Sequence, residues 1–199
     1  MKTRNIPLKV FTVITALIIL SGCSHNIQLT PDLTSLREVK TGPVIDKNVA
    51  YFISQENHLK QVTTPGGGGD KVTYKPYADT EVALNTVLSK MFSRVYSLNS
   101  VDDQQYIDDK NISYIFVPKL TTNSSSSSML TWPPTNFTIS LSCEALDSTG
   151  NSVWQKTVES SGDADFNEFK SDFSLAARRA SEEAFRMLLN EINNADFYK

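Results

Sequence analysis

The sequence has few of the residues that build metal centres and disulfide scaffolds. Its 199 residues include two cysteines and two histidines, too few for a zinc cluster or a disulfide-stabilised small domain, and we expect no metal ion or other cofactor. Eight glycines and eight prolines exclude collagen and low-complexity polymers. The formal net charge of -3 gives no basic excess, so we expect no nucleic-acid partner. The 40% of hydrophobic and 10% of aromatic residues suffice for one globular domain with a hydrophobic core.

Residues 1–22 have the organisation of a signal peptide. Lys2, Arg4 and Lys9 are basic, and the eleven residues from 10 to 20 (VFTVITALIIL) are almost all apolar. A membrane-spanning helix needs about 20 apolar residues, so this run is too short to be one. Its length and its basic flank are typical of the core of a signal peptide.

The tetrapeptide Leu20-Ser21-Gly22-Cys23 follows this run directly and resembles the lipobox of bacterial lipoproteins. In that family the cysteine thiol is diacylglycerated, the preceding peptide is removed, and the new amino terminus is acylated. The resemblance therefore implies that Cys23 is the lipidation site. Ser24 stands where an aspartate usually marks inner-membrane retention, which implies an anchor in the outer membrane, on its periplasmic face. Each buried CH₂ of the acyl chains would contribute about 0.8 kcal/mol to that anchor.

Removal of the signal peptide changes the charge of the protein. Three of the 19 basic residues leave with it, so the mature part has 16 basic against 22 acidic residues. Anionic lipid surfaces repel such a protein, so we expect the acyl chains, and not a basic patch, to hold it at the membrane.

The mature chain divides into a tether and a domain. Residues 23–47 are polar, contain Pro31, Gly42 and Pro43, and show no sustained hydrophobic period, which predicts a lipidated N-terminus and flexible tether. Residues 48–199 are predicted to form a single periplasmic domain. The glycine run at 66–69 predicts a loop, because the Gly-Lys-Ser/Thr ending of a phosphate-binding loop is absent.

The hydrophobic periods of this domain predict an α+β fold. The predicted strands are residues 48–54, 114–122, 136–147 and 153–159, and the predicted helices run from 79 or 80 to about 95 and from about 173 to 193. This order favours a two-layer sandwich, in which two helices cover one face of an antiparallel sheet of about four strands. The element order is similar to that of small periplasmic lipoproteins of the YajG type and the lipopolysaccharide-assembly type.

Residues suited to nucleophilic catalysis are scarce. The alternation in 136–147 puts Cys143 on the apolar face of its strand, where a thiol is a small hydrophobic group and a poor nucleophile. The available bases, His25 and His58, lie beside Cys23 and in a polar loop, and no Gly-x-Ser-x-Gly sequence is present. We expect the protein not to be an enzyme.

Carboxylates cluster in two polar segments. Asp102 to Asp109 contains four aspartates, and Asp163-x-Asp165-x-Asn167 resembles the opening of a calcium-binding loop. The calcium pattern fails at its sixth position, Glu168, where glycine is needed, and at its twelfth, Ser174, where glutamate is needed. We therefore expect solvated acidic surfaces and no metal site.

A long loop between two predicted strands contains exposed apolar residues. Five serines at 124–128 precede Met129, Leu130 and Trp132, and two prolines follow. These three residues are candidates for contact with a protein partner, where tryptophan is a favoured anchor. Two alternatives are that Trp132 packs on its own sheet and that the loop enters the bilayer interface.

The functional prediction is an outer-membrane-anchored lipoprotein that acts as a non-enzymatic accessory or scaffold subunit of an envelope assembly. Its partners would be the membrane, through lipid on Cys23, and another envelope protein. The alternative is a periplasmic ligand-binding or hydrolase domain that uses Asp163, Asp165 or the carboxylates of 102–109.

Overall fold

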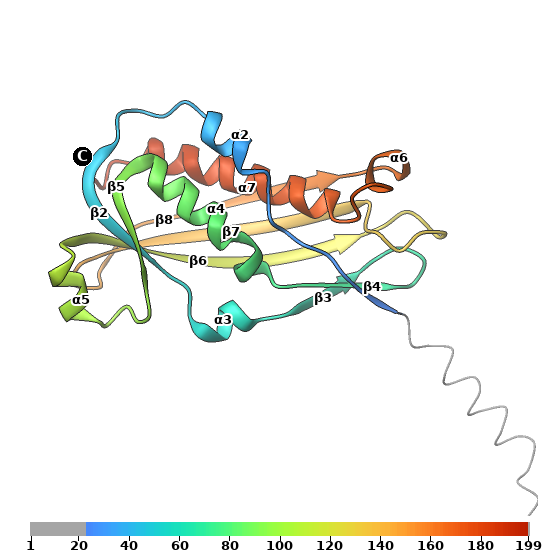
Figure 1. Ribbon diagram of the computed structural model, residues 1–199, viewed down its shortest axis with the longest axis horizontal. Helices are drawn as coiled ribbons and strands as arrows, with labels where there is room; N and C mark the ends of the chain where they lie inside the picture. The colour runs from blue at the N-terminus through green and yellow to red at the C-terminus, as the bar shows by residue number, and fades with distance from the viewer. Residues whose placement is uncertain (1–22, 199) are drawn as a thin grey trace, which may run out of the picture.

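Residues 23–198, the part of the chain described in a computed structural model, form two mixed β-sheets and six helices (Figure 1). The predicted signal peptide, residues 1–22, lies outside the described residues. None of the helices described is long and apolar enough to cross a membrane.

The larger sheet has five strands in the order β5-β2-β6-β7-β8. Their bounds are β2 Ile45–Phe52, β5 Phe92–Leu98, β6 Ile112–Ser125, β7 Asn136–Asp147 and β8 Ser152–Asp163. Strands β6, β7 and β8 form an antiparallel meander, but β2 runs parallel to both β5 and β6. Parallel neighbours need a long crossover, which the chain between β2 and β5 provides. The prediction of one antiparallel sheet of about four strands with two helices is therefore wrong, whereas the α+β class is confirmed.

A second sheet of three strands holds the start of the described chain. It consists of β1 Ser24–Asn26, β3 Val62–Pro65 and β4 Lys71–Tyr74 in the order β1-β4-β3. Strand β1 pairs with β4 in parallel, and β3 pairs with β4 as an antiparallel hairpin. Side-chain hydroxyls join this sheet to β6: Thr64 and Ser124 lie 2.6 Å apart, and Tyr74 and Thr122 2.8 Å apart.

The segment 23–47 is not a flexible tether. Ile27, Leu29 and Leu36 are buried in the core, and Leu36 belongs to the short helix α2, Leu33–Glu38. The amide of Leu29 also donates to the Asp79 carboxylate at 3.2 Å, and burial raises the pKa of that carboxyl. Few apolar residues mark this segment, but three of them fill sites in the core, so it belongs to the same domain.

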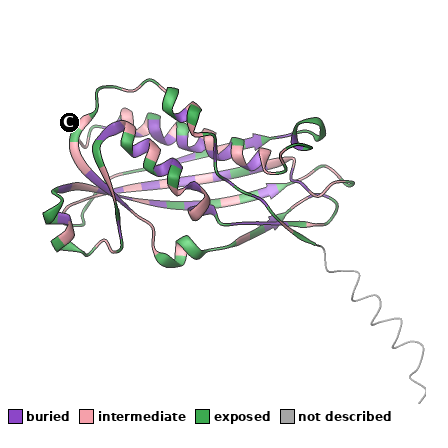
Figure 2. Ribbon diagram, in the orientation of Figure 1, coloured by how far each residue is buried: buried purple, intermediate pink, exposed green. Residues whose placement is uncertain are grey.

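Two long helices, α4 Pro76–Met91 and α7 Leu175–Asn193, pack against each other and lie on one face of the larger sheet (Figure 1). In Figure 2 the buried residues follow the strands and the helix faces turned toward them. The shorter helices are α3 Gln55–Leu59, α5 Gln104–Asp109 and α6 Phe166–Phe169. Helix α4 ends four residues earlier than predicted because β5 begins at Phe92 and pairs with β2, so Val95 lies in a strand.

The core between α7 and the sheet is closely packed. Phe137, Ile139, Leu141, Cys143 and Ala145 are all buried, which confirms the predicted phase of β7. A Cβ atom at Gly162 of β8 would overlap the carbonyl oxygen of Ala176 and the amide nitrogen of Ala180. Glycine is needed at this position because the backbone of α7 lies directly against the strand.

Candidate functional site

Cys23 is exposed and begins the described chain at the edge of the smaller sheet. Its carbonyl oxygen accepts a hydrogen bond from the Lys71 amide at 3.0 Å, and the next residue, Ser24, pairs with Lys71 in the ladder between β1 and β4. This pairing fixes the position of Cys23 on the domain. A lipid on its sulfur would therefore leave the molecule at one defined place.

The glycine run beside Cys23 holds two loops together. The Gly67 amide donates to the carbonyl oxygen of Trp132 at 2.8 Å, and the Gly68 amide donates to that of Ser128 at 3.1 Å. A Cβ atom at Gly67 would overlap the carbonyl oxygen of Thr131. The β3–β4 turn thus docks, backbone to backbone, on the loop of residues 126–135 between β6 and β7. This contact explains the glycines without a phosphate site.

Trp132 packs on its own domain. Its ring stacks on His25 with centroids 4.1 Å apart and planes 11° apart, and it contacts Phe173 at 5.0 Å. His25 Nε2 lies 2.8 Å from Asp70 Oδ2. Trp132 is half-buried by these contacts, as in the alternative that has it fold back on the domain. These contacts of Trp132 hold the 126–135 loop against the domain.

Met129 and Leu130, in contrast, extend into solvent. The two residues are 88% and 95% exposed, and they line one open hollow with Phe166, 60% exposed, and Phe173, 49% exposed. We call these four residues the apolar tip. They are half of the large hydrophobic side chains exposed in residues 23–198, and the remainder lie elsewhere: Val44, Leu59, Val82 and Val153. Phe166 and Phe173 were not predicted as members of a site, because only the fold brings them to the 126–135 loop.

The carboxylates of Asp163-x-Asp165-x-Asn167 and Glu168 start helix α6. Asp165 accepts hydrogen bonds from the amides of Asn167 and Glu168, and Glu168 Oε2 accepts from the Asp165 amide, which completes a capping box. The hydrogen bond from Arg179 to Glu168 Oε1, 2.8 Å long, is the largest influence that lowers the pKa of Glu168 to about 2. The resemblance to a calcium loop thus has a structural explanation. Within residues 23–198, no group of three or more histidine, cysteine or acidic side chains is placed to hold a metal.

The aspartates of 102–109 lie at the other end of the larger sheet, beside α5 (Figure 1). Asp103 caps α5 by accepting from the Tyr106 amide at 3.2 Å, and Asp108 accepts from the Gln104 side chain at 2.7 Å. The fold therefore keeps the two acidic segments apart. They cannot act together as a catalytic pair.

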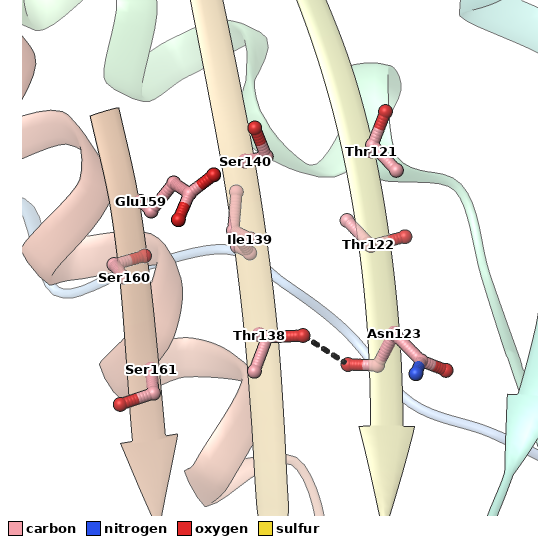
Figure 3. Close-up of a pocket in the computed structure, with 9 residues that line it drawn as sticks. All are labelled: Thr121, Thr122, Asn123, Thr138, Ile139, Ser140, Glu159, Ser160 and Ser161. Atoms are coloured by element: carbon pink, nitrogen blue, oxygen red, sulfur yellow. Dashed lines mark hydrogen bonds between the residues drawn. The ribbon is translucent and has the colours of Figure 1, made fainter. Parts of the chain in front are cut away.

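A further hollow lies on β6, β7 and β8, on the sheet face opposite α7 (Figure 3). Its side chains are mainly hydroxyls, and Thr138 Oγ1 donates to the carbonyl oxygen of Asn123 at 3.4 Å. Among the residues that line it, Glu159 alone is ionisable. Two-carboxylate hydrolysis needs a second acidic group, which this lining does not provide.

Comparisons with known proteins give distant likenesses of fold. No family model matches the sequence, and no curated protein does. One similar solved structure is a PelC dodecamer from Paraburkholderia phytofirmans, with 13% identity, 79% of this chain and 96% of that chain covered, and a TM-score of 0.46. Another, a DUF330 protein from Xanthomonas campestris, has 13% identity, coverage of 85% and 91%, and a TM-score of 0.44. At these TM-scores the likenesses assign neither a family nor a function.

Proposed function

We propose that this chain is a lipoprotein anchored through Cys23 to the periplasmic face of the outer membrane, where it serves as a non-enzymatic accessory or scaffold subunit of an envelope assembly. The observation that carries the proposal is the position of Cys23. It follows the lipobox-like Leu20-Ser21-Gly22 in the sequence and is exposed at the first residue that the structure describes. The other thiol, Cys143, is buried in β7 and is closed to acylation.

The acidic side chains at and beside α6 favour a scaffold over a hydrolase that uses them. Asp165 and Glu168 hold the first turn of α6, Glu168 also pairs with Arg179, and Asp163 accepts a hydrogen bond from the Asn136 side chain at 2.8 Å. General acid catalysis near neutral pH needs a carboxyl with a raised pKa, whereas that of Glu168 is lowered to about 2.

The attachment of β1 gives the scaffold a fixed geometry. Because Ser24 already pairs with β4, the domain would begin one residue after the lipidated cysteine. Such a domain would stand directly on the membrane surface instead of moving on a tether. Its orientation relative to a neighbouring envelope protein would then be restricted, which suits an assembly subunit.

Metabolic labelling with radioactive palmitate tests the anchor. We expect label on the wild-type protein and on Cys143→Ala, and none on Cys23→Ser, which should also keep its uncleaved amino terminus. Cys143→Ala serves as the matched control because it removes the other thiol of the mature chain. Label that persists on Cys23→Ser, or is lost from a folded Cys143→Ala protein, would overturn the proposal.

A further inference from the structure

We infer that the apolar tip, Met129, Leu130, Phe166 and Phe173, rests in the interfacial layer of the same bilayer that holds the lipid on Cys23. The inference builds on the proposed lipidation and adds a second, protein-made contact with the membrane. The acyl chains would attach the domain, and the tip would set which way it faces.

The tip and Cys23 belong to one continuous end of the domain. Cys23 is hydrogen-bonded to Lys71. Four residues before Lys71, Gly67 of the β3–β4 turn is hydrogen-bonded to the loop that contains Met129 and Leu130. Phe173 joins this end through its contact with Trp132. In Figure 1 the start of β1, the β3–β4 turn, the 126–135 loop and α6 lie at the same end of the molecule. Lipid on Cys23 would therefore bring the tip to the membrane.

The tip is also built to keep its shape. The backbone hydrogen bonds from Gly67 and Gly68 hold the 126–135 loop, and the stack of Trp132 on His25 supports it. Phe166 contacts the buried ring of Phe169 at 5.7 Å. Little backbone entropy remains to be lost when such a surface enters the interface, where aromatic and aliphatic side chains are favourable.

The charges around the tip favour an apolar contact over an electrostatic one. Lys71 and Lys170 are exposed nearby, but so are Asp163 and Asp165, and the mature chain has more acidic than basic residues. An attraction to anionic head groups would need a basic surface. We therefore expect contact with neutral phosphatidylcholine, at low and high salt alike.

The position of the lipid anchor favours a membrane, and not a protein, as the surface that covers the apolar tip. A protein partner on Met129 and Leu130 would have to fit between the tip and the membrane to which the neighbouring Cys23 is tied. A lipid surface needs no such space, because side chains at an interface enter about 5–10 Å into the boundary of head groups and acyl chains.

Quenching of tryptophan by brominated lipid tests the inference. The mature lipidated protein, which begins at Cys23, is placed in phosphatidylcholine vesicles with bromine on the acyl chains, as two reporter variants, Leu130→Trp and Val44→Trp. Val44 is a matched control: it is 58% exposed and precedes β2, whose Asn48 pairs with Ile112 at the end of β6 farthest from the tip. The emission of the parent, which has Trp132 and Trp154, is subtracted from both.

We expect the tryptophan introduced by Leu130→Trp to lose roughly half of its emission or more, since interfacial surfaces lie at the depth of the first acyl carbons. The tryptophan introduced by Val44→Trp should keep its emission, and 0.5 M salt should change neither result (roughly a 4 Å screening length).

An unquenched Leu130→Trp protein that still floats with the vesicles would overturn the inference while the lipid anchor stands. Concentration-dependent dimers in that case would identify a second copy as the occupant. Protein that neither floats nor carries lipid on Cys23 would instead remove the proposed function and this inference together.

Discussion

Gly67→Ala tests the contact that positions the apolar tip. The added methyl group would overlap the carbonyl oxygen of Thr131, and it would also lie 2.9 Å from Ser126 Oγ and 3.1 Å from the carbonyl oxygen of Ser128. Two of these three atoms belong to backbone, so a rotamer change cannot relieve the overlap. The β3–β4 turn and the 126–135 loop must separate.

The separation would break the two backbone hydrogen bonds from Gly67 and Gly68, each worth about 1 kcal/mol. It would also loosen the stack of Trp132 on His25, for which about 0.5–1.5 kcal/mol is typical of aromatic pairs. Alanine also lowers the entropy of the unfolded chain, which stabilises the folded state by about 0.4–1 kcal/mol. The expected net loss is therefore about 1–3 kcal/mol in the free energy of unfolding.

Urea unfolding, followed by circular dichroism and by tryptophan emission, measures this loss. Gly42→Ala is the control, because its Cβ atom would meet the nearest atom at 3.8 Å and its backbone does not require glycine. The control should unfold within about 0.5 kcal/mol of the wild type. A Gly67→Ala protein as stable as the control, with unchanged Trp132 emission, would refute the docking of the two loops.

Two further predictions concern buried and paired groups. Cys143 should resist thiol reagents in the native protein, because burial raises the pKa of its thiol to about 12, and Cys143→Ser should lower the free energy of unfolding by roughly 1–3 kcal/mol if its hydroxyl finds no partner. Rapid labelling of the native protein would contradict this placement. Glu168→Gln should reduce stability at neutral pH, and its deficit relative to wild type should shrink as the pH falls from about 4.5 to about 2, since a carboxylate with a lowered pKa stabilises only while it is ionised. A deficit that stays constant over this range, measured by thermal melting, would contradict the pairing of Glu168 with Arg179.

Local hydrophobic periods predicted the elements whose own sequence decides their structure. Strand β7 is found at the predicted residues, and α7 begins two residues after its predicted start and ends at the predicted one. The helical spacing of the residues up to Val95 wrongly predicted that the first long helix extends to that residue. The pairing of β5 with β2, a contact between distant segments, outweighs this local pattern. The parallel pairing of β2 depends on the crossover between distant strands, so no pattern within one segment of the sequence predicts it.

Only the part of the apolar tip that lies in one continuous segment could be predicted from the sequence. A run of apolar residues after five serines singled out Met129 and Leu130, and both are exposed. Trp132 has the same local signal, yet it packs on His25, a residue more than a hundred positions away. Phe166 and Phe173 join the tip through the fold alone. The buried residues Ile27, Leu29 and Leu36 were missed for a related reason, since a few scattered apolar residues in a polar segment do not create a hydrophobic period.

If Cys23 is the lipidation site, the mature protein begins at an acylated Cys23. Intact mass spectrometry of protein extracted from the envelope with mild detergent measures this directly, because it reports both the first residue and any added lipid. We expect a chain that starts at Cys23 and carries the mass of a diacylglyceryl group and an amino-terminal acyl chain. A chain that starts at another residue, or one that starts at Cys23 without added mass, would contradict it.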